Sequence, residues 1–183
     1  YYSRYPRPLR DFVWSRMEGM LSRYPAKIGS VLSPLFGIVD APNIATKLKI
    51  QTSSVEEIIN NPPDVILLQD SFTTYFRPQP ISSFLQIIHT LGLQIAVLPV
   101  RPCGKALHVR GKLRAFHAVA HANVQWLEQL KDTGIPIVGI DPAATLLWRD
   151  EYPQILKLEP IKVQLPQEWL VEQDLSQLEI QGN

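Results

Sequence analysis

DVILLQD, residues 64–70, is an aliphatic run that ends in two polar side chains. Two runs of the same kind follow, QIAVLPV at residues 94–100 and IPIVGID at residues 135–141. The stretches between them, residues 80–92 and 110–134, are amphipathic and end at a glycine, as helices often do. Short buried strands that alternate with amphipathic helices are typical of a parallel sheet with crossover connections. The sequence therefore predicts an α/β fold, a Rossmann-like parallel β-sheet flanked by helices.

The two ends of the chain differ from this central pattern. After the third run we expect a helix over residues 143–156 and, within residues 158–173, a last strand and helix. Residues 1–62 are rich in Pro, Arg and aromatic side chains and predict an N-terminal helical segment rather than strands. The interpretation is a helical lead-in over residues 1–62 followed by an α/β domain over residues 63–183.

Three stretches of the lead-in favour helices. Residues 11–24 and 26–32 carry apolar side chains at helical spacing. SSVEEIINN, residues 53–61, adds a short helix with Ser53 or Ser54 as its N-cap and acidic residues in its first turn. This part of the sequence is therefore expected to form a helical lead-in whose helices are broken by prolines.

Composition limits the classes of function. The chain has 183 residues, 45% of them hydrophobic, and a formal net charge of +1, which argues against a nucleic-acid partner. A single cysteine excludes an internal disulfide and suits a reducing, cytoplasmic setting. No apolar run reaches the roughly 20 residues that a membrane-spanning helix needs, and no signal-peptide pattern is present. Because the sequence starts at Tyr1 without Met, we expect it to be part of a larger protein.

Polar side chains gather where the three expected strands end, the place at which open α/β sheets bind their ligands. The loops expected at these ends are QDSFTTYF, RPCGKALHVRG and DPAATL. Several cations around one crevice would suit a carboxylate substrate or an acidic partner, whereas a solvated polar rim would carry the same residues. The candidate pocket consists of Asp70, Ser71, Thr73, Tyr75, Arg101, Cys103, Gly104, Lys105, His108, Arg110 and Asp141.

Cys103 has two interpretations in its loop. A nucleophile needs a nearby base, and His108 lies five residues further on. No second cysteine stands at CxxC spacing, which favours a small side chain in a tight turn. His117 and His121 are four residues apart on the expected helix, a spacing compatible with a shared metal ion. They flank its apolar stripe with no acidic residue between them, so we expect positions beside the core and no metal.

The three strand ends together resemble a known family. DSFTTYFRPQ at residues 70–79, Pro-Cys-Gly at residues 102–104 and RDEYPQIL at residues 149–156 resemble the cysteine-rich, or CCG, domain. This domain is found in heterodisulfide reductase and in the iron–sulfur subunit of glycolate oxidase. The likeness covers residue 64 to about residue 156. In that family, cysteines at the strand ends hold an iron–sulfur cluster or zinc, which suits converging thiolates.

The resemblance implies a degenerate copy of that site. The cysteine positions of the family correspond to Ser71, Pro102, Cys103 and Ala144, so one thiol of four is present. A single thiolate cannot hold a cluster or a tetrahedral zinc. We therefore expect these four residues to be vestigial ligand positions, with no catalytic residue, no cofactor and no metal in this chain.

Within that family, the chain most resembles the C-terminal region of large bacterial FAD-linked oxidoreductases similar to D-2-hydroxyglutarate or D-lactate dehydrogenase. The resemblance implies a parent enzyme with FAD and a 4Fe-4S cluster, in which this chain is a non-catalytic part. The implied partners are an FAD domain, a ferredoxin-like domain and a second CCG repeat, whose pairing would cover an open sheet edge.

Three other interpretations stay open. The first is a standalone catalyst that turns over a 2-hydroxy acid. The second is an anion-binding or carboxylate-binding module without a redox role. The third is a membrane-surface module, because residues 1–36 are basic and aromatic. It would place the protein peripherally at the inner face of the membrane, near a quinone-linked acceptor.

Overall fold

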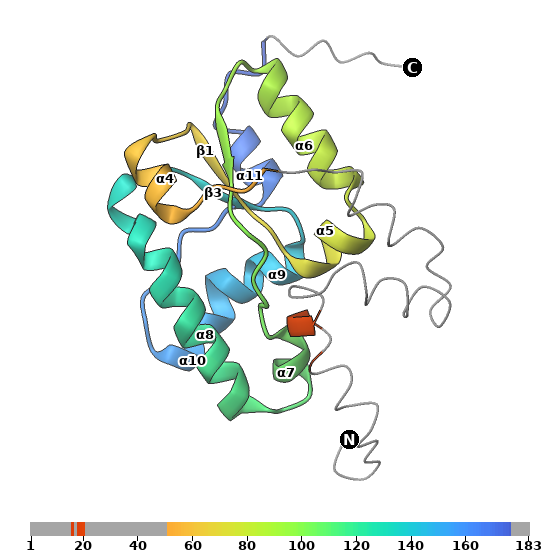
Figure 1. Ribbon diagram of the computed structural model, residues 1–183, viewed down its shortest axis with the longest axis vertical. Helices are drawn as coiled ribbons and strands as arrows, with labels where there is room; N and C mark the ends of the chain where they lie inside the picture. The colour runs from red at the N-terminus through yellow and green to blue at the C-terminus, as the bar shows by residue number, and fades with distance from the viewer. Residues whose placement is uncertain (1–15, 17, 21–50, 177–183) are drawn as a thin grey trace.

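The sheet consists of three parallel strands, as the sequence predicts. The computed structural model describes residues 16, 18–20 and 51–176. Strands β1 (Val65–Leu68), β2 (Ile95–Val97) and β3 (Ile137–Gly139) lie in the order β2-β1-β3, with β1 paired to both neighbours (Figure 1). The prediction of a Rossmann-like α/β fold is confirmed. Each strand is shorter than the aliphatic run that predicted it. Asp70 and Asp141, at the ends of the first and third runs, cap the helices that follow.

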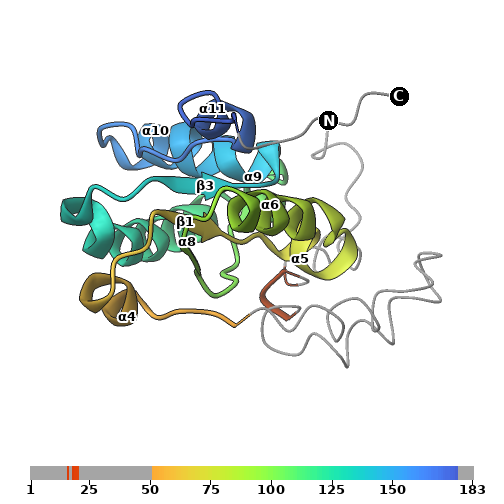
Figure 2. The same ribbon diagram turned by 90° about the horizontal axis from the view of Figure 1, so that it is seen from above.

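Helices cover both faces of the sheet (Figure 2). Helices α6 (Gln79–Thr90) and α11 (Pro166–Leu170) pack on one face, where Phe84 and Trp169 meet edge to face at 5.8 Å. Helices α4 (Val55–Asn60), α8 (Leu113–Leu127) and α10 (Tyr152–Leu156) contribute to the core on the other face. Successive side chains of a strand point to opposite faces, so every residue of β1 is buried in one of these two cores.

The connections between the strands determine which segments lie at the carboxyl ends of the strands. The chain passes from β1 through α5 (Ser71–Phe76) and α6 to β2, and from β2 through α7 (Lys105–Val109) and α8 to β3. Helices α6 and α8 lie on opposite faces of the sheet, and open sheets of this kind bind ligands at the carboxyl ends of their strands. The carboxyl ends of β1 and β3 are neighbours in the sheet.

The segments after β1 and β2, expected as loops, each contain a short helix, α5 and α7 respectively. After β3, α9 (Pro142–Leu146) begins within the loop expected there and starts the helix expected over residues 143–156. Asp70 and Asp141 cap two of these helices through their carboxylates, which makes the turn into a helix favourable. The third helix begins at Gly104, whose φ of 75° only glycine adopts readily.

The longer predicted helices are present with local changes. The single helix expected over residues 110–134 is α8 followed by a 3-10 segment, Glu128–Thr133, which Gly134 ends. The helix expected over residues 143–156 contains a π-helical segment, Leu147–Glu151, between α9 and α10. Pro153 lacks the N–H that would bond the carbonyl of the preceding turn, and this accounts for the interruption.

Helix α4 confirms the helix predicted over residues 53–61. Ser54 is its N-cap and forms a capping box with Glu57. Ile58 is buried in the core under the sheet, so α4 packs with the α/β domain. The boundary between residues 62 and 63 stays a prediction. The helices expected at residues 11–24 and 26–32 lie outside the described residues, apart from Arg16 and residues 18–20, which are helical.

The C-terminal tail adds a helix and very little strand. The predicted last strand is a single parallel bridge between Val138 and Gln164, and the predicted helix is α11. In the part of the chain that the structure describes, no helix has the length and apolar character needed to cross a membrane.

Candidate functional site

Two aspartates stand at the carboxyl ends of β1 and β3. Asp70 Oδ1 accepts hydrogen bonds from the backbone N–H groups of Phe72 and Thr73, both at 2.8 Å. Asp141 Oδ1 accepts one from Ala144 N at 2.7 Å. Burial raises the pKa of Asp70, and the charge of Asp141 acts in the same direction. Both carboxylates therefore start helices at the carboxyl ends of the strands rather than projecting freely from them.

The loop after β2 carries the cysteine and is held by a carboxylate from the N-terminal segment. Glu18 Oε1 accepts a hydrogen bond from Cys103 N at 2.5 Å, and Glu18 Oε2 accepts one from Gly104 N at 2.9 Å. Only 4% of the surface of Glu18 is exposed. In Figure 1 the short red fragment that includes Glu18 lies beside α7. The carboxylate thus covers the strand-end loop from outside the α/β unit.

Sequence reasoning missed this residue. Glu18 lies 85 residues before its partner Cys103, and no motif surrounds it. The one available signal is an acidic side chain within a segment dominated by basic and aromatic residues. The partner of a buried carboxylate becomes visible only when the two segments meet in space.

Burial and neighbouring charge govern the protonation of this cluster. Burial raises the pKa of Glu18, and the charge of Asp70 adds to the effect. Burial also raises the pKa of the Cys103 thiol well above its usual value, helped by the charge of Glu18 and by a hydrogen bond with it. Since the thiolate is the reactive form of cysteine, a buried neutral thiol is a poor nucleophile. The structure therefore favours the interpretation of Cys103 as a small side chain in a tight turn.

Tyr152 and Asn123 hold the same loop from the inside. The buried Tyr152 hydroxyl donates to the carbonyl of Cys103 at 2.6 Å and accepts from Asn123 Nδ2 at 2.9 Å. Asn123 Nδ2 also lies 2.9 Å from the carbonyl of Pro102, and its Oδ1 accepts from Arg101 Nε at 3.0 Å. The Tyr152 of the Arg-Asp-Glu-Tyr-Pro motif therefore has a structural task, which is to fix the loop that carries Cys103.

Gly104 completes the turn because no other residue fits there. Its φ of 75° is in the left-handed region, and a Cβ at this position would lie 3.2 Å from the side chains of Phe116 and Val119 on α8. The loop can approach α8 this closely only without a side chain.

The predicted cations are engaged within the domain. Lys105 Nζ lies 2.5 Å from Glu151 Oε1, and His108 Nδ1 lies against Glu151 Oε2. The His108 ring stacks on Phe116, and the Arg101 guanidinium lies 4.7 Å from the centre of the Trp126 ring. These contacts occupy three of the side chains that an anion site would use. The anion pocket stays a prediction.

The remaining predicted residues lie around this network. Tyr75 on α5 is half-buried, and burial raises its pKa. Thr73 is buried on the same helix, and Arg110 follows α7 as its C-cap. His117 and His121 are both exposed on α8, not beside the core as expected, because the inner face of the helix is formed by its apolar residues and Asn123.

The four positions that the resemblance marks as ligand sites do not fit an iron–sulfur cluster. Ser71 is buried at the first position of α5, Pro102 and Ala144 offer no ligand atom, and Cys103 offers one thiol beside the Glu18 carboxylate. A cluster needs several converging thiolates, and a carboxylate against the one thiol would repel an anionic centre. Within residues 51–176 and the few described before them, no three His, Cys, Asp or Glu side chains are placed to hold a metal ion.

Known proteins match the chain by sequence. No family model and no solved structure matches it. It is 36% identical over 198 residues to a D-2-hydroxyglutarate dehydrogenase of Pseudomonas putida, covering 94% of the chain and 20% of that protein. The identity to the Escherichia coli protein of the same name is 30% over 200 residues, covering 93% of the chain and 19% of the relative. The chain is homologous to one part of these dehydrogenases.

These relatives support the expected resemblance at its coarser level. A third D-2-hydroxyglutarate dehydrogenase, from Pantoea ananatis, is 31% identical over 208 residues, covering 99% of the chain and 20% of the relative. The chain spans about a fifth of the length of the curated relatives it matches. The likeness to large oxidoreductases of this type is therefore supported, and the assignment to the CCG domain stays a prediction.

The raised pKa of Glu18 leads to a prediction about pH. The folded state keeps this proton to a higher pH than the unfolded state, so the free energy of unfolding should fall as pH rises from about 4.5 through the folded-state pKa of Glu18. The pKa of Asp70 is also raised, so this group should lower the free energy of unfolding in the same way as pH rises from about 3.8. Urea unfolding over a series of pH values measures the slope.

Glu18→Gln is the matched variant, since it removes the titration and keeps an acceptor oxygen. We expect a shallower slope above pH 4.5, with the contribution of Asp70 remaining. The pKa values of the exposed Glu168 and Asp174 are lowered. These two groups therefore change the free energy of unfolding only at lower pH, where the stability that they contribute is lost as pH falls. An unchanged or steeper slope for Glu18→Gln would contradict the assignment.

Proposed function

We propose that this chain is a cluster-free, non-catalytic CCG-type domain of an FAD- and iron–sulfur-dependent oxidoreductase that acts on a 2-hydroxy acid of the D-2-hydroxyglutarate class. Its role is structural: it shapes the region in which the catalytic and electron-transfer domains assemble. FAD and the 4Fe-4S cluster belong to other domains of the parent polypeptide. The D-2-hydroxyglutarate dehydrogenases that match over nearly the whole chain support this context.

One observation carries the proposal. Protein groups fix the Cys103 loop on both sides, with Glu18 on its backbone N–H groups and Tyr152 on its carbonyl. A metal centre in related domains would fix the same loop through thiolate ligands. In this chain the carboxylate of Glu18, the phenol of Tyr152 and the amide of Asn123 hold the loop in place. These contacts explain how the loop keeps its shape without thiolate ligands to a metal centre.

The same contacts argue against a catalytic role for the chain itself. The thiol is buried and neutral, and the two aspartates cap helices. The nearby side chains of Lys105 and His108 share Glu151. Such groups stabilise a fold, whereas general acids, bases and nucleophiles need access to a substrate.

Metal analysis of the parent polypeptide, purified without air, tests the proposal. We expect the Cys103→Ala variant to retain the same iron, zinc and acid-labile sulfide content as the unmodified protein, because Cys103 ligates nothing. We also expect its rate of D-2-hydroxyglutarate oxidation with an artificial electron acceptor to stay within about twofold.

The controls distinguish the properties of the 183-residue chain from those of the parent polypeptide. The 183-residue chain alone should not oxidise a 2-hydroxy acid, with or without added FAD. Loss of about one equivalent of zinc, or of a whole cluster, on Cys103→Ala substitution would show that this thiol is a ligand and would refute the cluster-free assignment. Oxidation by the 183-residue chain itself would refute the non-catalytic role.

A further inference from the structure

Strand β2 forms one edge of the sheet and presents free backbone groups there. Val65 N donates to the carbonyl of Gln94 at 3.3 Å, and Leu98 N donates to that of Leu67 at 2.9 Å. Ala96 pairs with Ile66 between these two bonds. In a parallel ladder, alternate residues bond to the neighbouring strand, so the backbone groups of Ile95 and Val97 point to the outer edge.

The chain itself already uses part of this edge. Ser53 N donates to the carbonyl of Val97 at 2.8 Å, just before α4 begins. In the portion of the chain that the structure describes, this is the only backbone hydrogen bond recorded on the outer side of β2. The backbone groups of Ile95 therefore remain available at the middle of the edge.

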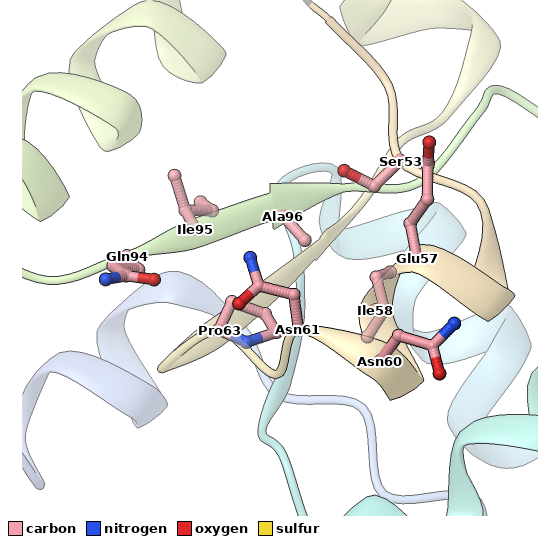
Figure 3. A pocket seen from close by; sticks show the side chains of 9 residues that line it. All are labelled: Ser53, Glu57, Ile58, Asn60, Asn61, Pro63, Gln94, Ile95 and Ala96. Carbon is pink, nitrogen blue, oxygen red and sulfur yellow. The ribbon is translucent and has the colours of Figure 1, made fainter.

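A groove of about 380 Å³ lies beside these groups (Figure 3). Ile58 and Ala96, which also belong to the core, and Pro63 give it an apolar part. The Asn61 side chain lies between α4 and the strand in Figure 3. The full lining is Ser53, Glu57, Ile58, Asn60, Asn61, Pro63, Gln94, Ile95 and Ala96.

We propose that this groove binds an extended segment of the parent polypeptide from outside these 183 residues, which adds a strand to the outer edge of β2. The segment pairs its backbone with Ile95 and directs a small apolar side chain toward Ile58 and Ala96. A basic residue next to it would complement Glu57, which alone among the lining residues carries a charge. The inference rests on the proposed function, in which the chain is one part of a larger oxidoreductase.

Two observations select this occupant. The matched region is 20% of the Pseudomonas putida relative, so about four-fifths of such a polypeptide lies outside it and can supply the segment. The edge is only three residues long, so it offers too few hydrogen bonds to hold a separate molecule or a second copy tightly. A tethered segment needs fewer contacts because its effective concentration is high.

Amide hydrogen exchange tests the proposal on the parent polypeptide and on the 183-residue chain. We expect the amides of Ile95 and Val97 to exchange at least about tenfold more slowly in the parent than in the chain alone. The Asn61→Trp substitution should abolish this protection in the parent, because the indole fills the groove. Glu56→Trp is the matched control, since Glu56 is exposed on α4 and does not line the groove.

Each other outcome overturns the proposal. Equal exchange in the parent and in the chain would show that the edge stays open. Protection that rises with the concentration of the chain alone would assign the groove to a second copy. Protection that survives Asn61→Trp would place the contact elsewhere.

The same samples separate this inference from the proposed function. Rapid exchange in a parent that oxidises D-2-hydroxyglutarate and binds no metal through Cys103 would overturn the docked strand alone. Protected amides in a polypeptide without activity toward 2-hydroxy acids would refute the proposed function and leave the docked strand in place.

Discussion

Replacing Glu18 with alanine is expected to lower the free energy of unfolding by about 2–4 kcal/mol, measured by urea unfolding near pH 5. The substitution removes the acceptor of two backbone N–H groups, those of Cys103 and Gly104. A buried donor left without a partner costs roughly 1–3 kcal/mol. Because the partners lie in different segments, the loss also releases the N-terminal segment from the strand-end loop.

Release of the N-terminal segment should be detectable as faster labelling of the Cys103 thiol. The thiol is 4% exposed and reacts only when the cover opens. A local loss of about 2 kcal/mol corresponds to a roughly thirtyfold increase in the open population, and hence in the rate of labelling by a thiol reagent. Thiol labelling therefore reports the contact even where global stability changes little.

Two variants make the result specific. Glu18→Gln keeps one acceptor oxygen and should lie between the alanine variant and the unmodified chain in labelling rate. Glu159→Ala removes an exposed carboxylate elsewhere and should change stability by less than about 0.5 kcal/mol. If Glu18→Ala and Glu159→Ala label Cys103 at the same rate, the carboxylate does not cover the loop.

The second large effect is expected at Tyr152. Truncation to alanine should destabilise the chain by about 3–5 kcal/mol, the range found for large aromatic side chains in a core. Tyr152 is fully buried, and its ring centre lies 5.6 Å from that of Phe116 and 5.1 Å from that of Trp148. Thermal and urea unfolding measure the loss.

The conservative variant isolates the hydroxyl. Tyr152→Phe keeps the ring and removes the donor to the carbonyl of Cys103 and one of the two acceptors of Asn123 Nδ2, which should cost roughly 1–3 kcal/mol. Tyr75→Phe, at a half-buried tyrosine on α5, is the control and should change stability by less than about 0.5 kcal/mol. Equal effects of the two phenylalanine substitutions would show that the hydroxyl of Tyr152 does not fix the loop.

Much of the fold could be predicted because its determinants are local. Aliphatic runs of strand length, glycines after amphipathic stretches and the Ser54 cap each act within a few residues. The short helices α5 and α7 at the strand ends were not predicted. The start of α5 depends on the carboxylate of Asp70, and a residue of this type is equally common in an open turn.

The candidate site could likewise be predicted only in part. The resemblance directed attention to Cys103, Gly104 and Tyr152, and the structure brings all three into one loop network. It could not show that Lys105 and His108 would share Glu151, since the charge of a side chain says nothing about which partner it will meet. The same limit concealed Asn123, an amide on the buried face of an amphipathic helix.

The sequence by itself determined the layered α/β arrangement, the order of the strands along the chain and the place of its one thiol after the second strand. Only the tertiary structure decided that Glu18 covers this thiol and that Tyr152 holds the loop beneath it. The physical reason is separation along the chain. Periodicity and capping act over one or two turns, whereas these contacts join residues 86 and 49 positions apart that burial brings together.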